Sequence, residues 1–108
     1  MLNRCVTIKK FMIERLGFVG IKILLALHGK RNALYIREIL REAKISSSTI
    51  NRALSVLTDF GLITCEYKYN RRFIRLTRYG IEVAEHIYQA DEKIKEAMKK
   101  KKEILNKP

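Results

Sequence analysis

The apolar residues of the chain follow helical spacing in some stretches and strand spacing in others, and this pattern divides the sequence into predicted elements. Over residues 1–16, apolar side chains including Ile8 and Met12 recur at helical spacing, although part of the stretch also alternates as a strand would. Residues 18–28 are apolar on most sides, which is typical of a helix buried among others, and Gly29 is expected to end it. The sequence therefore predicts an N-terminal helix followed by a central core helix.

Two further helices are predicted close together in the middle of the chain. A short apolar run at residues 34–36 predicts a very short strand or an extended lead, and residues 36–43 then place apolar and charged side chains on opposite faces of a two-turn helix. After a tight connection, residues 47–60 repeat apolar side chains in the i, i+3, i+4, i+7 pattern, and Gly61 is expected to end this helix. Ser46 stands at its N-cap position, where the hydroxyl is expected to accept a hydrogen bond from a backbone amide.

The rest of the chain predicts a hairpin and a long helix. Residues 62–68 and 73–77 alternate apolar and polar side chains as half-buried strands do, and residues 69–71 have the length of a hairpin loop. Apolar side chains at alternating spacings of three and four predict a helix over residues 78–104. Such a stripe is longer than one small domain can cover, which favours pairing with a second copy. The positions expected in that dimer seam are Ile81, Ala84, Tyr88, Ile94 and Met98, with Asp91 as a polar break.

The face opposite the apolar stripe of the helix at residues 47–60 is small and polar. It presents short hydrogen-bonding side chains and one long cation, namely Ser47, Ser48, Asn51, Arg52 and Ser55. Two helices joined by so short a turn match the helix-turn-helix, in which the second helix enters the DNA major groove. Asn can hydrogen-bond adenine at two edge atoms and Arg can do so with guanine, whereas Ser hydroxyls suit phosphates. Arg52 has a second interpretation as a phosphate contact.

The order of elements resembles the winged helix-turn-helix transcriptional regulators of prokaryotes and archaea, especially the MarR-like and ArsR-like groups. Residues 46–54 are similar to the recognition helix of those regulators, and residues 74–80 are similar to the step from their wing into the last helix. The resemblance implies an α+β, mainly helical fold with a DNA-binding core at residues 18–77, a two-stranded wing and a long C-terminal dimerisation helix. It also implies base reading by the exposed start of the recognition helix, at Ser47, Ser48, Asn51 and Arg52. The wing contacts that it implies to the DNA backbone or minor groove are those of Lys68, Arg71 and Arg72.

Composition and charge favour a polyanionic partner. The chain of 108 residues has the size of a single domain, 1–108, and 23 Lys and Arg against 11 Asp and Glu give a net charge of +12. Such a basic globular domain favours double-stranded DNA over the second candidate, an anionic membrane surface. Because no apolar stretch reaches the roughly 20 residues of a membrane span and cysteines are few, we expect a cytoplasmic protein. The many Ile and Lys residues and the single Gln are typical of thermophile or archaeal proteins, but also of AT-rich genomes.

No catalytic, metal or cofactor site is predicted. The sequence has no glycine-rich phosphate loop and no Cys or His pair at metal-ligand spacing, so an enzyme is not expected. Cys65 shares a strand face with Ile63 and is expected to be buried, whereas redox sensing at Cys5 is the less favoured interpretation of that residue. The five tyrosines are expected to pack in the core rather than line an effector pocket, and no effector is identified.

Three functions remain open at this point. The favoured one is a dimeric, sequence-specific transcriptional regulator. A winged-helix module that binds protein and an architectural protein that binds DNA without sequence choice are the alternatives. Polar side chains on the recognition face favour base reading, because an exposed apolar patch there would have favoured protein binding. The basic hairpin tip also has a simpler interpretation, in which its charges keep an exposed strand edge from pairing with other chains. Lys99 to Lys102 are expected to form a solvated helix end.

Overall fold

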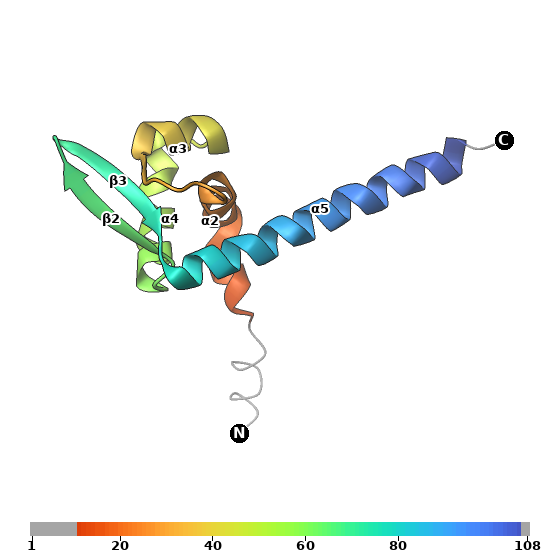
Figure 1. Cartoon of the computed structure of the whole chain (residues 1–108), viewed down its shortest axis with the longest axis horizontal. Helices are drawn as coiled ribbons and strands as arrows, with labels where there is room; N and C mark the ends of the chain where they lie inside the picture. The colour runs from red at the N-terminus through yellow and green to blue at the C-terminus, as the bar shows by residue number, and fades with distance from the viewer. Residues whose placement is uncertain (1–10, 107–108) are drawn as a thin grey trace, which may run out of the picture.

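Residues 11–106 of the computed structural model form four helices and a three-stranded antiparallel sheet (Figure 1). The elements are α2 (Met12–Leu27), β1 (Leu34–Tyr35), α3 (Ile36–Ala43), α4 (Ser47–Asp59), β2 (Ile63–Lys68), β3 (Arg71–Leu76) and α5 (Arg78–Asn106). Figure 1 shows helices α2, α3 and α4 grouped together, with the β2–β3 hairpin projecting on one side and α5 on the other. The predicted α+β, mainly helical fold is confirmed.

Helix α2 joins the end of the predicted N-terminal helix to the predicted core helix. Gly17 lies inside it at φ 69° and ψ 173°, a conformation that favours glycine and interrupts the helical backbone. The predicted boundary between two helices is therefore a kink at Gly17. Residues 1–10, which hold most of the predicted N-terminal helix and Cys5, lie outside the described residues. At the other end, Gly29 follows the helix at φ 76°, in agreement with its predicted role as a helix stop.

Helices α3 and α4 have almost the predicted bounds. The backbone of Lys44 adopts φ 55° directly after α3, and this left-handed residue begins the tight turn into α4. Ser46 occupies the N-cap of α4, but the prediction that its hydroxyl accepts a hydrogen bond from a backbone amide was wrong. The hydroxyl lies 3.1 Å from each of the hydroxyls of Ser48 and Thr49 instead. The amide of Thr49 already donates to the backbone carbonyl of Ser46, which leaves the hydroxyls to pair with one another.

The hairpin has a shorter turn than predicted. Strands β2 and β3 pair with Lys68 opposite Arg71, so the turn consists of Tyr69 and Asn70, at φ 53° and 60°. Two central residues with positive φ are the mark of a type I′ turn, whose twist matches that of the flanking strands. Arg71 therefore belongs to β3 and not to the loop. Strand β1 pairs with the other edge of β3, which confirms the predicted short strand and completes the order β1-β3-β2.

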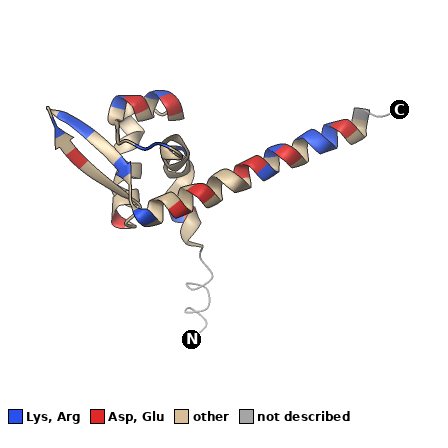
Figure 2. Cartoon of the chain, in the orientation of Figure 1, with Lys and Arg blue, Asp and Glu red and all other residues tan. Residues whose placement is uncertain are grey.

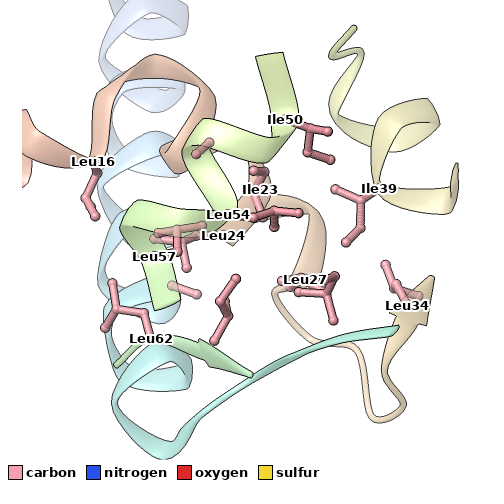
Figure 3. Packing of buried hydrophobic residues seen from close by; sticks show 14 residues of the cluster. Leu16, Ile23, Leu24, Leu27, Leu34, Ile39, Ile50, Leu54, Leu57 and Leu62 are labelled. Atoms are coloured by element: carbon pink, nitrogen blue, oxygen red, sulfur yellow. The ribbon is translucent and has the colours of Figure 1, made fainter. Parts of the chain in front are cut away.

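One cluster of buried apolar side chains holds the helices against the sheet (Figure 3). Every described element contributes to it; the members are Leu16, Ile23, Leu24, Leu27, Leu34, Ile39, Ile50, Ala53, Leu54, Leu57, Leu62, Ile63, Ile74 and Ala84. Ala84 is completely buried in this cluster because the first turns of α5 lie against α2 and β3. Its predicted place in a dimer seam was therefore wrong, since no surface of this residue is left for a partner.

Cys65 and most of the tyrosines are exposed, contrary to expectation. Cys65 shares a strand face with the buried Ile63, but its side chain is exposed because β2 is an edge strand of the sheet, whereas Ile74, directly opposite Cys65 on the central strand β3, is completely buried. Strand periodicity gives the face of a side chain and not the place of its strand in the sheet. The exposed tyrosines are Tyr67, Tyr69, Tyr79 and Tyr88, with 75%, 91%, 69% and 40% of their surface accessible.

Two sets of contacts fix α5 to the rest of the fold. The Thr77 hydroxyl donates to the Gly61 carbonyl at 2.5 Å and accepts from the Gly80 amide at 3.1 Å, which caps the start of the helix. Farther along, the His28 ring at the end of α2 hydrogen-bonds Glu85 at 2.5 Å and stacks on Tyr88 with 4.3 Å between ring centroids. The hydrogen bond from His28 lowers the pKa of Glu85 below its ordinary value. These contacts determine the direction in which α5 leaves the domain.

Candidate nucleic-acid interface

The five polar residues predicted on α4 are all exposed on the structure. They are Ser47, Ser48, Asn51, Arg52 and Ser55. On the opposite side of the helix, Ile50, Leu54 and Leu57 are buried in the core and fix the orientation of α4 against α2 (Figure 3). The exposed N-terminal turn also presents backbone amides, which together with the helix dipole favour a phosphate group. The helix therefore offers hydrogen-bonding groups along one free side.

Asn51 contacts the hairpin directly. The Arg72 guanidinium donates a hydrogen bond from Nη2 to Oδ1 of Asn51 at 2.6 Å, and Arg72 itself is half-buried on β3. This contact joins two groups that the sequence predicted as separate contributions, one from the recognition helix and one from the wing. Because the carbonyl oxygen of Asn51 accepts from Arg72, the Nδ2 group is the part of this amide left to donate to a base.

A cleft of about 460 Å³ lies between the start of α3, helix α4 and the hairpin. Its lining residues are Tyr35, Ile36, Arg37, Asn51, Tyr67, Asn70, Arg71 and Arg72. Three of these are arginines and none is acidic, so the cleft is a positive surface. The Arg71 guanidinium lies over the Tyr35 ring, 5.2 Å from its centroid, in a cation–π contact.

Arg37 is a residue of the cleft that sequence reasoning missed. Helical spacing placed it on the solvent face of α3, with nothing to distinguish it from the other charged residues there. The pairing of β1 with β3 brings the first turn of α3, which follows β1 directly, beside the hairpin. Arg37 is therefore identified by its position two residues after β1, the strand that pairs with β3. The pairing of β1 with β3 is not visible in the local periodicity of the sequence.

Ser48 and Arg52 face a different hollow from Asn51. They line a groove of about 490 Å³ with Arg15 and the kink at Gly17. Arg15 is exposed, and its guanidinium lies 5.4 Å above the centroid of the Phe60 ring. The predicted reading residues thus divide into a side next to the hairpin and a side next to α2. The position of Arg52 beside a second arginine favours its interpretation as a phosphate contact.

The hairpin carries an excess of positive charge. Residues 63–76 contain four cations and a single acidic residue, Glu66. The Nζ atom of the predicted wing residue Lys68 lies 3.5 Å from a Glu66 carboxylate oxygen, in an exposed pair that stabilises the fold little. Figure 2 shows Lys and Arg dominating the hairpin, whereas α5 carries charges of both signs and has four consecutive lysines, Lys99–Lys102, near its end. The positive charge is therefore concentrated in two places, on the hairpin beside α4 and near the end of α5.

Residues 11–106 offer no group of three or more His, Cys, Asp and Glu side chains placed to hold a metal ion. No helix in the described part of the chain is long and apolar enough to cross a membrane. No protein-family model matches the chain, and no curated protein sequence is significantly similar to it.

Several solved structures are similar to this one. Sso10a-2, a DNA-binding protein from Sulfolobus solfataricus, superimposes with a TM-score of 0.56 at 17% identity, over 82% of this chain and 97% of that one. BpsR from Bordetella bronchiseptica, whose DNA binding is regulated by 6-hydroxynicotinic acid, gives 0.68 at 17% identity over 81% and 64%. A MarR-family transcriptional regulator from Silicibacter pomeroyi gives 0.67 at 24% identity over 80% and 60%.

These similarities show the fold. The chain has the winged-helix fold, in which α3 and α4 form the helix-turn-helix and the β2–β3 hairpin forms the wing. The chain spans less than two thirds of the length of the two regulators, from Bordetella and Silicibacter, and nearly the full length of the Sulfolobus protein.

Proposed function

We propose that this chain is a dimeric, sequence-specific, double-stranded DNA-binding transcriptional regulator. In this proposal α4 enters the major groove and the basic wing lies on the backbone or in the minor groove. The observation that carries the proposal is the 2.6 Å hydrogen bond between Arg72 and Asn51, beside a cleft lined by three arginines. It makes a base-reading group and the basic wing one continuous surface. The similarity to structures described as DNA-binding proteins and regulators supports the proposal.

Each side of α4 has its own part in this proposal. On the wing side, Asn51 reads a base edge while Arg71 and Lys68 neutralise phosphates of the backbone. On the α2 side, Ser48 and Arg52 hold a phosphate of the opposite strand together with Arg15, which lies in the same groove. Ser47 and Ser55 complete the exposed face at either end. Contacts on both sides of one helix are what insertion between two phosphate backbones requires.

The proposed dimer forms through the outer part of α5. This helix of 29 residues is about 43 Å long, and its first turns alone pack against the domain. The apolar residues predicted for the seam that remain exposed are Ile81, Tyr88, Ile94 and Met98, and Ile104 and Leu105 extend the set toward the end of the helix. Pairing with a second copy would remove this apolar surface from water. Two recognition helices would then meet major grooves about 34 Å apart, on a pseudo-palindromic site.

The test is fluorescence anisotropy across a salt series, with a duplex from the protein's own upstream promoter and a scrambled duplex of equal length. We expect the promoter complex to be at least about 10³-fold tighter than the scrambled complex and to persist as salt rises. The non-specific complex should weaken steeply, because its affinity comes from released counterions. Absence of binding to either duplex at low salt would contradict DNA binding and favour a protein-interaction module.

A second candidate is an architectural protein that binds DNA without sequence choice. The observation that favours it is the net charge of +12, because cations that neutralise phosphates bind DNA of any sequence. The same titration separates the two candidates. Equal affinities for several unrelated duplexes, including promoter fragments, with equally steep salt dependence would support the architectural function and contradict base reading.

A further inference from the structure

The tip of the wing exposes two aromatic rings that the packing of the domain does not use. Tyr67 is 75% exposed at the end of β2, and Tyr69 is 91% exposed in the turn. An aromatic ring stabilises a fold mainly through the area that it buries, so these two rings contribute little in that way. Tyr67 also lines the cleft beside Asn51, which places the aromatic tip next to the proposed DNA surface.

The backbone of the turn is less favourable with tyrosine than with a smaller residue. Tyr69 adopts φ 53°, in the left-handed region where bulky side chains are rare. Two-residue turns of this type usually hold Gly, Asn or Asp at such a position, and Asn70 follows that preference at the next one. A bulky ring that is both exposed and held in a disfavoured conformation indicates a use other than stability.

Cations neighbour the two tyrosines along the hairpin. Lys68 lies between them in sequence, and Arg71 stands opposite Lys68 in the hairpin, directly after the turn. Arg72 pairs with Tyr67 across the strands and bonds Asn51, so Lys68 and Arg71 are the cations nearest the tip itself. Exposed aromatic side chains interleaved with cations are the arrangement that binds unpaired nucleic acid, since the rings stack on bases and the cations hold phosphates. A continuous duplex does not present its base faces to such rings.

We propose that the wing tip is a base-stacking site, in which Tyr67 and Tyr69 stack on unpaired bases of a DNA strand whose phosphates contact Lys68 and Arg71. The proposal rests on the proposed DNA-binding function and adds a substrate class to it, namely DNA that contains an opened or unpaired step. The helix-turn-helix binds the flanking duplex while the wing tip holds the exposed bases.

The test compares three DNA probes that carry the same label and the same strand sequence: a continuous duplex, that duplex with a three-nucleotide unpaired bubble, and the single strand. For the full chain we expect the bubble duplex to bind roughly tenfold more tightly than the continuous duplex. Tyr69→Ala and Tyr67→Ala should each reduce this preference. Tyr69 does not line the cleft, so Tyr69→Ala should also leave the affinity for the continuous duplex within about twofold. Tyr79→Ala is the matched control, because Tyr79 is 69% exposed at the start of α5 and should retain the full preference.

A spectroscopic measurement detects stacking independently of affinity. The sequence contains no tryptophan, so Tyr69→Trp provides a single indole fluorophore at the wing tip. Its emission should be quenched when the bubble duplex binds and should change little with the continuous duplex. Circular dichroism of every variant checks that the fold is retained.

Each contrary outcome has a defined meaning. Equal affinities for the bubble and continuous duplexes, or unchanged tryptophan emission at saturation with the bubble duplex, would overturn the stacking site while leaving the proposed DNA-binding function intact. A loss in Tyr69→Ala that is equal for both duplexes would also overturn it, because the ring would then be a general contact. Absence of binding to all three probes would contradict the proposed function and the stacking site together.

Discussion

At the scale of single residues, the hydrogen bond between Arg72 and Asn51 bears on how the proposed reading residue would present its amide to a base. A free asparagine amide offers both an acceptor and a donor, which is the combination that matches adenine in the major groove. Here Arg72 donates to the Asn51 oxygen at 2.6 Å and uses one of its two lone pairs, so the second lone pair and the Nδ2 donors remain. Where only Nδ2 reaches the base, it matches an acceptor edge such as N7 or O6 of guanine, or O4 of thymine. Adenine recognition through two bonds would use the second lone pair of the oxygen while Arg72 stays bound to the first.

Removal of Asn51 and of Arg72 should therefore have coupled effects. We expect Asn51→Ala to cost about 1 to 3 kcal/mol at the preferred site and to relax the preference there. Arg72→Ala should produce part of the same loss, and the double variant should lose less than the sum, because each residue acts partly through the other. Anisotropy titrations of the parent, the two single variants and the double variant on cognate and altered sites measure this coupling. Strict additivity would contradict the coupling.

Arg71→Ala is the comparison variant, which should weaken binding to all sequences alike and lower the salt slope by about one unit.

The residues of the interface were predictable only where they depend on local periodicity. The exposed side of α4 follows from the helical spacing of its buried residues, so all five polar positions were placed correctly. Arg37 and the contact between Arg72 and Asn51 depend on how α3, α4 and the hairpin come together, which no local pattern encodes. Cys65 was misplaced for a related reason, since its exposure depends on the place of β2 at the edge of the sheet.

At the scale of secondary-structure elements, the bounds were predictable where a residue with special backbone geometry marks an end. Gly29 and Gly61 adopt positive φ directly after α2 and near the end of α4, as their positions in the sequence indicated. The hairpin turn was harder, because Tyr69 does not have the composition of a two-residue turn. The turn is shortened to two residues by the register between β2 and β3, a pairing that is visible only in the folded chain.

The junction between the wing and α5 depends on a glycine with no space for a side chain. A Cβ atom at Gly80 would overlap the Leu62 carbonyl, and that carbonyl accepts the Thr77 amide at 2.9 Å. We expect Gly80→Ala to destabilise the protein by about 1 to 3 kcal/mol or more, because the backbone of the junction must move. Thermal unfolding followed by circular dichroism would measure this loss.

Gly20→Ala is the matched control for this junction. Gly20 is also buried in a helix, but a Cβ atom there would meet Leu16 at 3.4 Å and Leu57 at 3.8 Å, which are ordinary contact distances. Alanine also favours the helical backbone over glycine by up to about 1 kcal/mol, so this variant should be as stable as the parent or more so. If the two variants unfolded at the same temperature, steric conflict at Gly80 would not be the cause of any loss.

At the scale of the whole molecule, the two ends have different chemistry. The hairpin carries unbalanced positive charge beside α4 (Figure 2), whereas the far part of α5 carries an exposed apolar stripe, charges of both signs and four consecutive lysines near its end. The proposed DNA contact and the proposed self-association therefore involve surfaces that do not overlap. A substitution in the hairpin should therefore leave dimerisation measurable, and a substitution in the far part of α5 should leave DNA binding measurable.

A charge placed in the apolar stripe tests the dimer. Ile94 is 61% exposed on the part of α5 that projects beyond the domain, and Ile94→Asp should convert dimers to monomers in sedimentation equilibrium. The monomer should keep its fold and weak binding to a half-site, because residue 94 lies outside the buried core. Lys99→Asp places the same side chain away from the centre of the stripe and should remain dimeric. A dimer that persists in Ile94→Asp would place the interface elsewhere on the chain.

The direction in which α5 leaves the domain is fixed by contacts with α2. In the proposed dimer, the length of α5 therefore sets both the distance and the angle between the two DNA-binding ends. The contacts of His28 with Glu85 and Tyr88 hold one end of the helix, and in the proposed dimer the partner holds the other. Each added residue lengthens a helix by about 1.5 Å and turns it by about 100°. One residue inserted between Tyr88 and Ile94 would aim the two DNA-binding ends at different sides of the duplex. Seven residues fall only about 20° short of two full turns, so an insertion of seven would nearly preserve the direction of each DNA-binding end while it lengthens the helix by about 10.5 Å. A homologue with seven more residues in α5 should therefore bind half-sites of the same orientation at a wider spacing.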